Sequence, residues 1–218
     1  TRSHSYGLYQ RVATPTNRST AEATKDYLLG QLFNKLAPQQ FARLRNRGTE
    51  GFIAASVSYS PLVRGYAQFA WDVVPYQGQD ELALKQLLYG RTVEAAMGFD
   101  KVDFDSEKQK IYDDMKSILS DKRTLGTPEN FMDIYRNNYL YGTPIQDFRT
   151  QLEENLETLV ELESEDLREW VKGRFMGNKN LAFITYNAST SEPTISEKTF
   201  TELLAKYSQL DATKQAQG

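Results

Sequence analysis

The stretch FARLRNRGTEGF, residues 41–52, decides how this chain is interpreted, because a predicted helix ends in it and a predicted strand begins. Phe41 and Leu44 continue an apolar helical face into Arg45. After Gly51, residues 52–60 are rich in β-branched and aromatic side chains, and residues 67–73 alternate between apolar and polar. The pattern predicts a helix followed by a β-hairpin, with Arg45 and Phe52 near its mouth.

The residues on either side extend this prediction. STAE, residues 19–22, has the spacing of a capping box, and apolar side chains then recur at helical spacing from Tyr27 to Leu36. Pro38 is expected to end this helix or to begin a short second one, because proline lacks the amide that a helix interior needs. Residues 61–65 are expected to connect the two strands of the hairpin.

The rest of the chain predicts a strand near the start, a run of helices and a final strand. Strands are expected over residues 4–12 and 181–186, and helices over 80–97, 104–119, 128–141, 148–160, 165–175 and 197–207. We found no internal repeat. These elements predict an α+β domain in which helices cover one face of an antiparallel sheet. The domain is expected over residues 1–187, with a linker, a C-terminal helix and a polar tail over 188–218.

Composition excludes several function classes. The net charge of -3, with interspersed signs, argues against nucleic acid, and no stretch has the roughly 20 apolar residues that cross a bilayer. The absence of cysteine excludes disulfides and thiol catalysis. The only histidine, His4, cannot supply the usual ligand set of a catalytic zinc, so no metal site is expected. Because Thr1 is not an initiator, we expect a fragment or a processed piece of a longer polypeptide.

Two blocks resemble the C-terminal, non-zinc half of the insulinase or pitrilysin (M16) metallopeptidases. The first is Phe-x-x-Leu-Arg, residues 41–45, followed by Gly51 and Phe52, where that family has Gly-Tyr opening a strand. The second runs through LETL at 156–159, SEDLREWV at 164–171 and NLAFI at 180–184, and is similar to the family's closing helices and last strand. The resemblance runs from about Ser5 to Asn187.

The resemblance implies a role in peptide hydrolysis. It implies that Arg45 contacts the substrate across a chamber whose zinc is held by a partner N-terminal M16 domain or subunit, and that this chain alone is inactive. The family's tyrosine would donate a hydrogen bond at the position of Phe52, which cannot, so Tyr59 or Tyr66 is a candidate replacement donor and substrate contact. Relatives of this type are often exported bacterial proteins, which is compatible with a periplasmic location.

Other interpretations stay open beside this one. A catalytically inactive structural or partner subunit of the same superfamily would explain Phe52, and an unrelated α+β binding module would have a pocket unconnected with Arg45. Arg45 could interact only with the helix C-terminal dipole or with a surface carboxylate, and Phe52 could be a core aromatic. Residues 52–60 could also add an extended peptide as a further strand. Tyr135, Tyr139 and Tyr141 are expected to pack in the family's inner layer with their hydroxyls at the surface.

Overall fold

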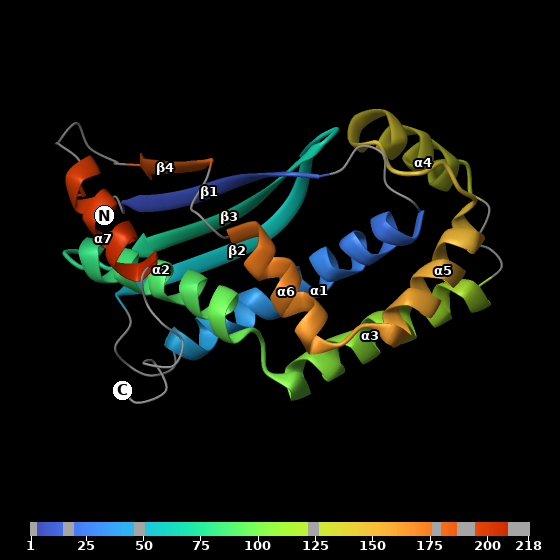
Figure 1. Cartoon of the computed structure of the whole chain (residues 1–218), viewed down its shortest axis with the longest axis horizontal. Helices are drawn as coiled ribbons and strands as arrows, with labels where there is room; N and C mark the ends of the chain where they lie inside the picture. The colour runs from blue at the N-terminus through green and yellow to red at the C-terminus, as the bar shows by residue number, and fades with distance from the viewer. Residues whose placement is uncertain are drawn as a thin grey trace.

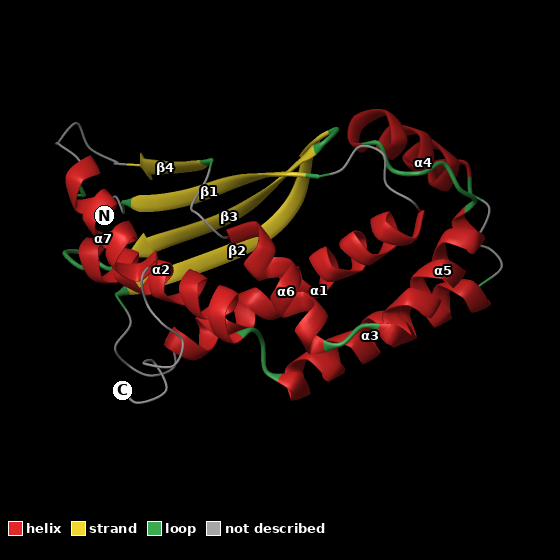
Figure 2. Ribbon diagram, viewed as in Figure 1, coloured by secondary structure: helices red, strands yellow, loops and turns green. Residues whose placement is uncertain are grey.

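The structure, a computed structural model, describes residues 4–14, 20–45, 51–121, 127–175, 180–186 and 195–208. In this part of the chain, four antiparallel strands form one sheet in the order β2-β3-β1-β4, and helices cover one of its faces (Figures 1 and 2). The strands are β1 (Ser5–Ala13), β2 (Phe52–Val63), β3 (Tyr66–Pro75) and β4 (Leu181–Tyr186). The predicted α+β architecture is confirmed.

Seven helices lie within the described residues. They are α1 (Thr20–Arg45), α2 (Asp80–Met97), α3 (Lys101–Ser120), α4 (Pro128–Tyr141), α5 (Phe148–Glu161), α6 (Ser164–Phe175) and α7 (Glu197–Ser208). Local sequence accounts for several boundaries. The side chains of Asp100, Thr127 and Asp147 accept hydrogen bonds from the first amides of α3, α4 and α5, and Gly142 ends α4 in the left-handed conformation.

The expected break at Pro38 is wrong, because α1 continues through it to Arg45. An internal proline costs about 3 kcal/mol. Leu36, Ala37 and Phe41 are almost fully buried around Pro38. Burying a Leu or Phe side chain contributes roughly 1.5–3 kcal/mol, so two such side chains offset the proline. Tertiary burial therefore overrides the local helix-breaking signal.

The expected connection over residues 61–65 is also shorter than the sequence indicated. Strand β2 continues to Val63, and only Arg64 and Gly65 form the turn, with Gly65 at a φ of 83°. Pro61 lies in β2 at a register irregularity between Pro61 and Val63. Because β2 is an edge strand, a proline there removes no obligatory ladder bond.

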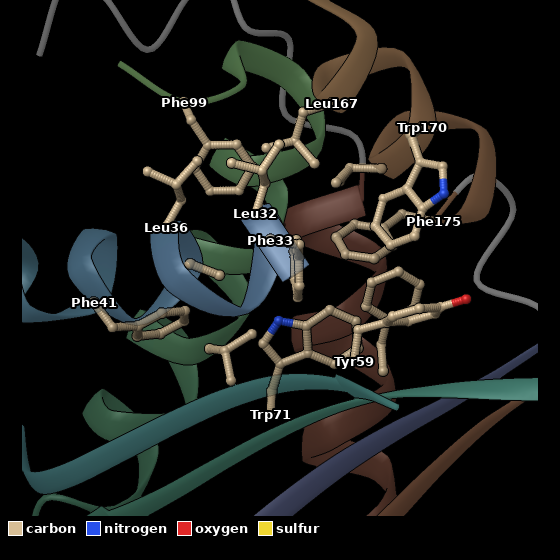
Figure 3. Close-up of a cluster of buried hydrophobic side chains, with 14 of the residues drawn as sticks. Leu32, Phe33, Leu36, Phe41, Tyr59, Trp71, Phe99, Leu167, Trp170 and Phe175 are labelled. Carbon is tan, nitrogen blue, oxygen red and sulfur yellow. The ribbon is translucent and has the colours of Figure 1, made fainter. Parts of the chain in front are cut away.

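One aromatic cluster joins the helices to the sheet. Trp71 of β3 points toward the helices (Figure 3), and its ring packs against Phe175 of α6 and Phe69 of the same strand. The ring centroid of Trp71 lies 5.0 Å from that of Phe175, and Phe33 and Trp170 lie 6.1 Å apart. Trp71 and Trp170 are 0% and 8% exposed, so both tryptophans anchor the core between the sheet and the helices.

Helix α7 packs on the same core as the preceding elements. Phe200 stacks on Phe183 of β4 with ring centroids 4.1 Å apart, and Ile195 and Leu203 are buried. The predicted boundary after residue 187 falls in 187–194, outside the described residues. The division into 1–187 and 188–218 stays a prediction.

Helix α4 departs from the sequence prediction in its orientation. Tyr135 and Tyr139 are 60% and 79% exposed, so the expectation that they pack in an inner layer is wrong. Apolar periodicity alone does not indicate which side of a helix meets the core, and here the aromatic side faces solvent.

Within the described residues, no helix is both long and apolar enough to cross a bilayer.

Candidate functional site

The predicted site begins where α1 ends and β2 begins. Gly51 is fixed there by two hydrogen bonds: its amide donates to Gln86 Oε1 at 2.8 Å, and its carbonyl accepts from the Tyr76 amide at 2.9 Å. A Cβ at position 51 would lie 2.8 Å from Leu82 Cγ and 2.9 Å from the Ala83 amide nitrogen. The start of β2 therefore lies so close to the start of α2 that only glycine fits.

Arg45 is the last residue of α1. Its side chain and residues 46–50 lie outside the described part of the structure. The backbone places Arg45 at the end of the domain where β2 begins (Figure 1). Its role as a substrate contact stays a prediction.

Phe52 begins β2 opposite Pro75 and is 2% exposed. Its ring belongs to the hydrophobic core of the domain. The side chain therefore contributes packing at the position where the resembling family has a tyrosine. Its assignment to a catalytic position stays a prediction.

Tyr59 lies seven residues further along β2 and is held from both sides. Asn34 of α1 pairs with its backbone: the Tyr59 amide donates to Asn34 Oδ1 at 2.7 Å, and Asn34 Nδ2 donates to the Tyr59 carbonyl at 2.9 Å. The ring packs 4.8 Å from both Phe69 and Trp170, and the hydroxyl donates to Asp26 Oδ2 at 3.4 Å. The side chain is only 8% exposed.

Tyr66 lies at the opposite end of the hairpin. It is 42% exposed, pairs with Val63 beside the turn, and carries the Arg11 guanidinium 5.0 Å from its ring centroid. Phe52 pairs with Pro75, nine residues from Tyr66 along β3, which corresponds to about 30 Å of strand. The structure thus brings the ends of α1 and β2 together, whereas Tyr59 and Tyr66 lie along the hairpin away from Phe52.

Sequence reasoning missed a polar cluster around Asp26. Asp26 Oδ1 accepts hydrogen bonds from Trp170 Nε1 at 3.0 Å and from Arg174 Nη2, while the Arg174 guanidinium lies 4.3 Å over the Trp170 ring. The cluster joins α1 to α6 beside Tyr59. The available signal was a single aspartate at the start of an apolar-periodic helix, which does not identify partners more than 140 residues away.

His4 directly precedes β1, and its half-buried side chain reaches the first residue of α2. Its Nδ1 is 2.8 Å from Asp80 Oδ1, and the Tyr6 hydroxyl donates to the same oxygen at 2.6 Å. Burial opposes ionisation of Asp80, but the hydrogen bonds from Tyr6 and His4 outweigh it and hold the pKa of this carboxyl below its ordinary value. This arrangement ties β1 to the first turn of α2.

Comparison with known proteins rests on structure, because no family model and no curated protein matches the sequence. The periplasmic protease PqqL from Escherichia coli superposes with a TM-score of 0.72 and 15% identity over 96% of this chain. A predicted insulinase family protease from Yersinia pestis gives a TM-score of 0.67 and 13% identity over 94% of this chain. The chain has the fold of an M16 insulinase-family protease domain.

This M16-like domain spans a part of each of those proteins. It covers 23% of the PqqL chain, 45% of the chain in a structure of the first half of PqqL, and 43% of the Yersinia protein. A structure described as the peptidase M16 inactive domain from Pseudomonas fluorescens matches with a TM-score of 0.61 and 11% identity, over 84% of this chain and 40% of that one. The sequence-based resemblance to M16 domains is confirmed for the fold.

The M16-like domain contains no metal-binding constellation in its described residues. No group of three or more His, Cys, Asp or Glu side chains there has an arrangement that could hold a metal ion. The acidic cleft of about 580 Å³ between α1 and α6, which includes Glu22, Glu165 and Glu169, is no exception.

Proposed function

We propose that this chain is the non-zinc, C-terminal-type half of an M16 metalloendopeptidase, which closes a peptide chamber over a zinc-bearing N-terminal M16 domain or subunit. The observation that carries the proposal is an M16 domain fold over 96% of a chain whose described residues hold no metal-binding group. In this proposal zinc lies on the partner, the substrate is a peptide, and this chain alone is inactive.

Arg45 has the proposed role of contacting the substrate. An arginine suits this role because its guanidinium is always charged and presents several donors in a fixed plane. The backbone supports it, since the last residue of α1 lies at the same end of the domain as Gly51, whose contacts with α2 fix the start of β2. A rigid backbone at this point would hold the arginine at a constant position relative to the chamber.

Phe52 favours a second candidate, a catalytically inactive structural or partner subunit with the same fold. Its ring is 2% exposed and carries no hydroxyl. Loss of one oxyanion donor costs on the order of 2.7–4 kcal/mol in the activation barrier. The similarity to a domain described as inactive is in line with this candidate.

Peptide cleavage by the complete assembly tests the proposal. The assembly that contains this chain and a zinc-bearing domain is assayed with a fluorogenic peptide, and bound zinc is measured by atomic absorption. We expect Arg45→Ala to lower kcat/KM at least tenfold with zinc content unchanged. Arg43→Ala is the matched control, because Arg43 lies on the same helix and pairs with Asp103.

The outcomes separate the two candidates. Unchanged turnover in Arg45→Ala would refute the role of Arg45. A wild-type assembly that binds no zinc and cleaves no peptide would favour the inactive subunit. In an active assembly, Phe52→Tyr raises kcat if the missing hydroxyl limits the reaction, and an unchanged kcat indicates that another donor serves.

A further inference from the structure

A second cavity lies away from the end of the domain that carries Arg45. It has a volume of about 510 Å³ and is enclosed by α1, α3, α4 and α5. Helix α4 forms its outer wall and lies beside the tip of the β2–β3 hairpin (Figure 1). The size falls in the range of about 300–1,000 Å³ that small-molecule sites occupy.

The lining of this cavity combines apolar side chains with uncharged hydrogen-bonding groups. Carboxamide and hydroxyl side chains come from all but one of the enclosing helices: Thr24, Gln31, Asn130, Asn137, Gln151 and Asn155. Among the charged lining residues, Lys35 balances Asp114, and Asp133 is paired with Arg136 at 2.9 Å. The lining thus favours a neutral ligand with both donors and acceptors, because each carboxamide offers both.

Two of these polar side chains are almost completely buried without a protein partner. Thr24 on α1 and Asn155 on α5 are 8% and 6% exposed, and neither side chain forms a hydrogen bond with any other residue in the described part of the chain. Both side chains line the cavity, so their polar atoms are available to a ligand that enters it.

Helix α4 is oriented to complete a polar site. Asn130, Ile134 and Asn137 line the cavity. Three aromatic residues of α4, Phe131, Tyr135 and Tyr139, are exposed to solvent. The Arg64 guanidinium of the β2–β3 turn holds the helix in this orientation by donating to the Asn138 carbonyl at 2.7 Å. An arginine at the C-terminal end of a helix also interacts favourably with the helix dipole.

We propose that the cavity binds a neutral, multiply hydroxylated small molecule of the size of a mono- or disaccharide. Vicinal hydroxyl groups each donate and accept, which matches the carboxamides, and the apolar side chains of Phe148, Ile134 and Leu152 suit the C–H face of a sugar ring. Among the described residues, no sheet edge lines the cavity, whereas an extended peptide is commonly bound by adding it to such an edge. The proposal goes beyond the peptidase-related function and does not depend on it.

Binding is tested by titrating the isotopically labelled chain with glucose, maltose and N-acetylglucosamine, each separately, while side-chain amide resonances are followed by NMR. We expect at least one sugar to bind saturably and to shift the Asn155 amide signals. Asn155→Leu and the nearly isosteric Thr24→Val are each expected to weaken that binding at least tenfold. Thr158→Val on α5 is the matched control, because Thr158 does not line the cavity.

Each remaining outcome overturns the proposal. No saturable binding by any of the three sugars would show a cavity filled by water only. Equal affinity in the wild type, Asn155→Leu and Thr24→Val would place the sugar elsewhere. Preferential binding of a blocked neutral tripeptide or of citrate would show that the ligand class is wrong. Circular dichroism of each variant establishes that the fold is retained.

Discussion

Asn34 and Tyr59 are joined by two hydrogen bonds, in which one side-chain amide pairs with both polar groups of one strand residue. Tyr59 lies on β2, an edge strand of the sheet. Asn34 therefore takes the place that the backbone of a neighbouring strand would occupy. Edge strands are sites of unwanted pairing with other chains, and covering them is one way in which proteins prevent it. An extended peptide added along residues 52–60 would have to displace Asn34.

Replacing Asn34 should destabilise the domain and expose the edge. We expect Asn34→Leu to lower the free energy of unfolding by about 1–3 kcal/mol, because the Tyr59 amide and carbonyl lose their partner. Asn34→Asp keeps the acceptor for the Tyr59 amide but loses the donor to its carbonyl. Its free energy of unfolding, measured by urea denaturation, should lie between those of Asn34→Leu and the wild type. Equal stability of Asn34→Leu and the wild type would show that water satisfies these groups equally well.

Acid should weaken the contact between β1 and α2. The pKa of Asp80 is lowered in the folded state, so its ionised form contributes stability above the unfolded pKa of about 3.9, and this is lost as pH falls through the lower folded value. We expect Asp80→Asn to be less stable than the wild type at neutral pH, with the difference shrinking below about pH 4. Urea denaturation at several pH values measures this.

Glu81→Gln is the control for Asp80, because Glu81 lies in the same first turn and is exposed. Its effect should be small at every pH, as expected for a surface carboxylate paired with Lys85. A constant difference between Asp80→Asn and the wild type from neutral to acidic pH would contradict the proposed linkage.

Local sequence predicted most of this fold, and the failures share one physical cause. Helix starts at Asp80 and Pro128 and the strand over residues 181–186 depend on nearby residues, and the structure agrees with them. The break expected at Pro38 failed because distant side chains bury the residues around it. The predicted inward orientation of the α4 tyrosines failed for the converse reason. Periodicity indicates that a helix has an apolar stripe, but it does not indicate which other element covers that stripe.

For the predicted site, the sequence indicated the course of the backbone but not the partners of the side chains. Gly51 and Phe52 indicated a strand start, and the structure shows why glycine is needed there. The polar pairs of Asn34 with Tyr59 and of Asp80 with His4 join residues 25 and 76 positions apart, so no local pattern contains them. Thr24 and Asn155 lie in helical sequences without a distinguishing pattern, and only the structure shows that both line one cavity between α1 and α5.

Tyr9 should be the clearest reporter on the sheet face opposite the helices. Its hydroxyl donates to Asp72 Oδ1 at 2.6 Å, and this hydrogen bond, together with burial and the charge of Asp72, raises the pKa of Tyr9 to about 12. Because the raised pKa favours the neutral phenol, the stability it contributes is present below about pH 10 and is lost as pH rises toward 12.

Ultraviolet difference absorption of tyrosinate tests the Tyr9 assignment. We expect Tyr9→Phe to remove a late step of the alkaline titration and Asp72→Asn to shift that step to lower pH. Tyr186→Phe is the control, because Tyr186 is 73% exposed and takes no part in the contact between Tyr9 and Asp72, so the late step should persist in this variant. A titration curve unchanged by Asp72→Asn would contradict the assignment.

The start of β2 should not tolerate even one methyl group at Gly51. The added Cβ would meet the Ala83 amide nitrogen at 2.9 Å and Leu82 Cγ at 2.8 Å, and the backbone atom cannot move aside without shifting α2. We expect Gly51→Ala to lower the free energy of unfolding by about 1–3 kcal/mol, as overpacking usually does. If the proposed function holds, Gly51→Ala should also lower peptide cleavage by the assembly, because the start of β2, including Phe52, would shift.

Gly173→Ala provides the matched control for this experiment. Gly173 lies inside α6, and a Cβ there would meet no atom within 4 Å in the described structure. Alanine in a helix interior is favoured over glycine by roughly 0.5–1 kcal/mol, so this variant should be more stable than the wild type. Opposite signs for the two substitutions in urea denaturation would confirm the close approach of β2 to α2, and a stabilising Gly51→Ala would show that β2 begins further from α2.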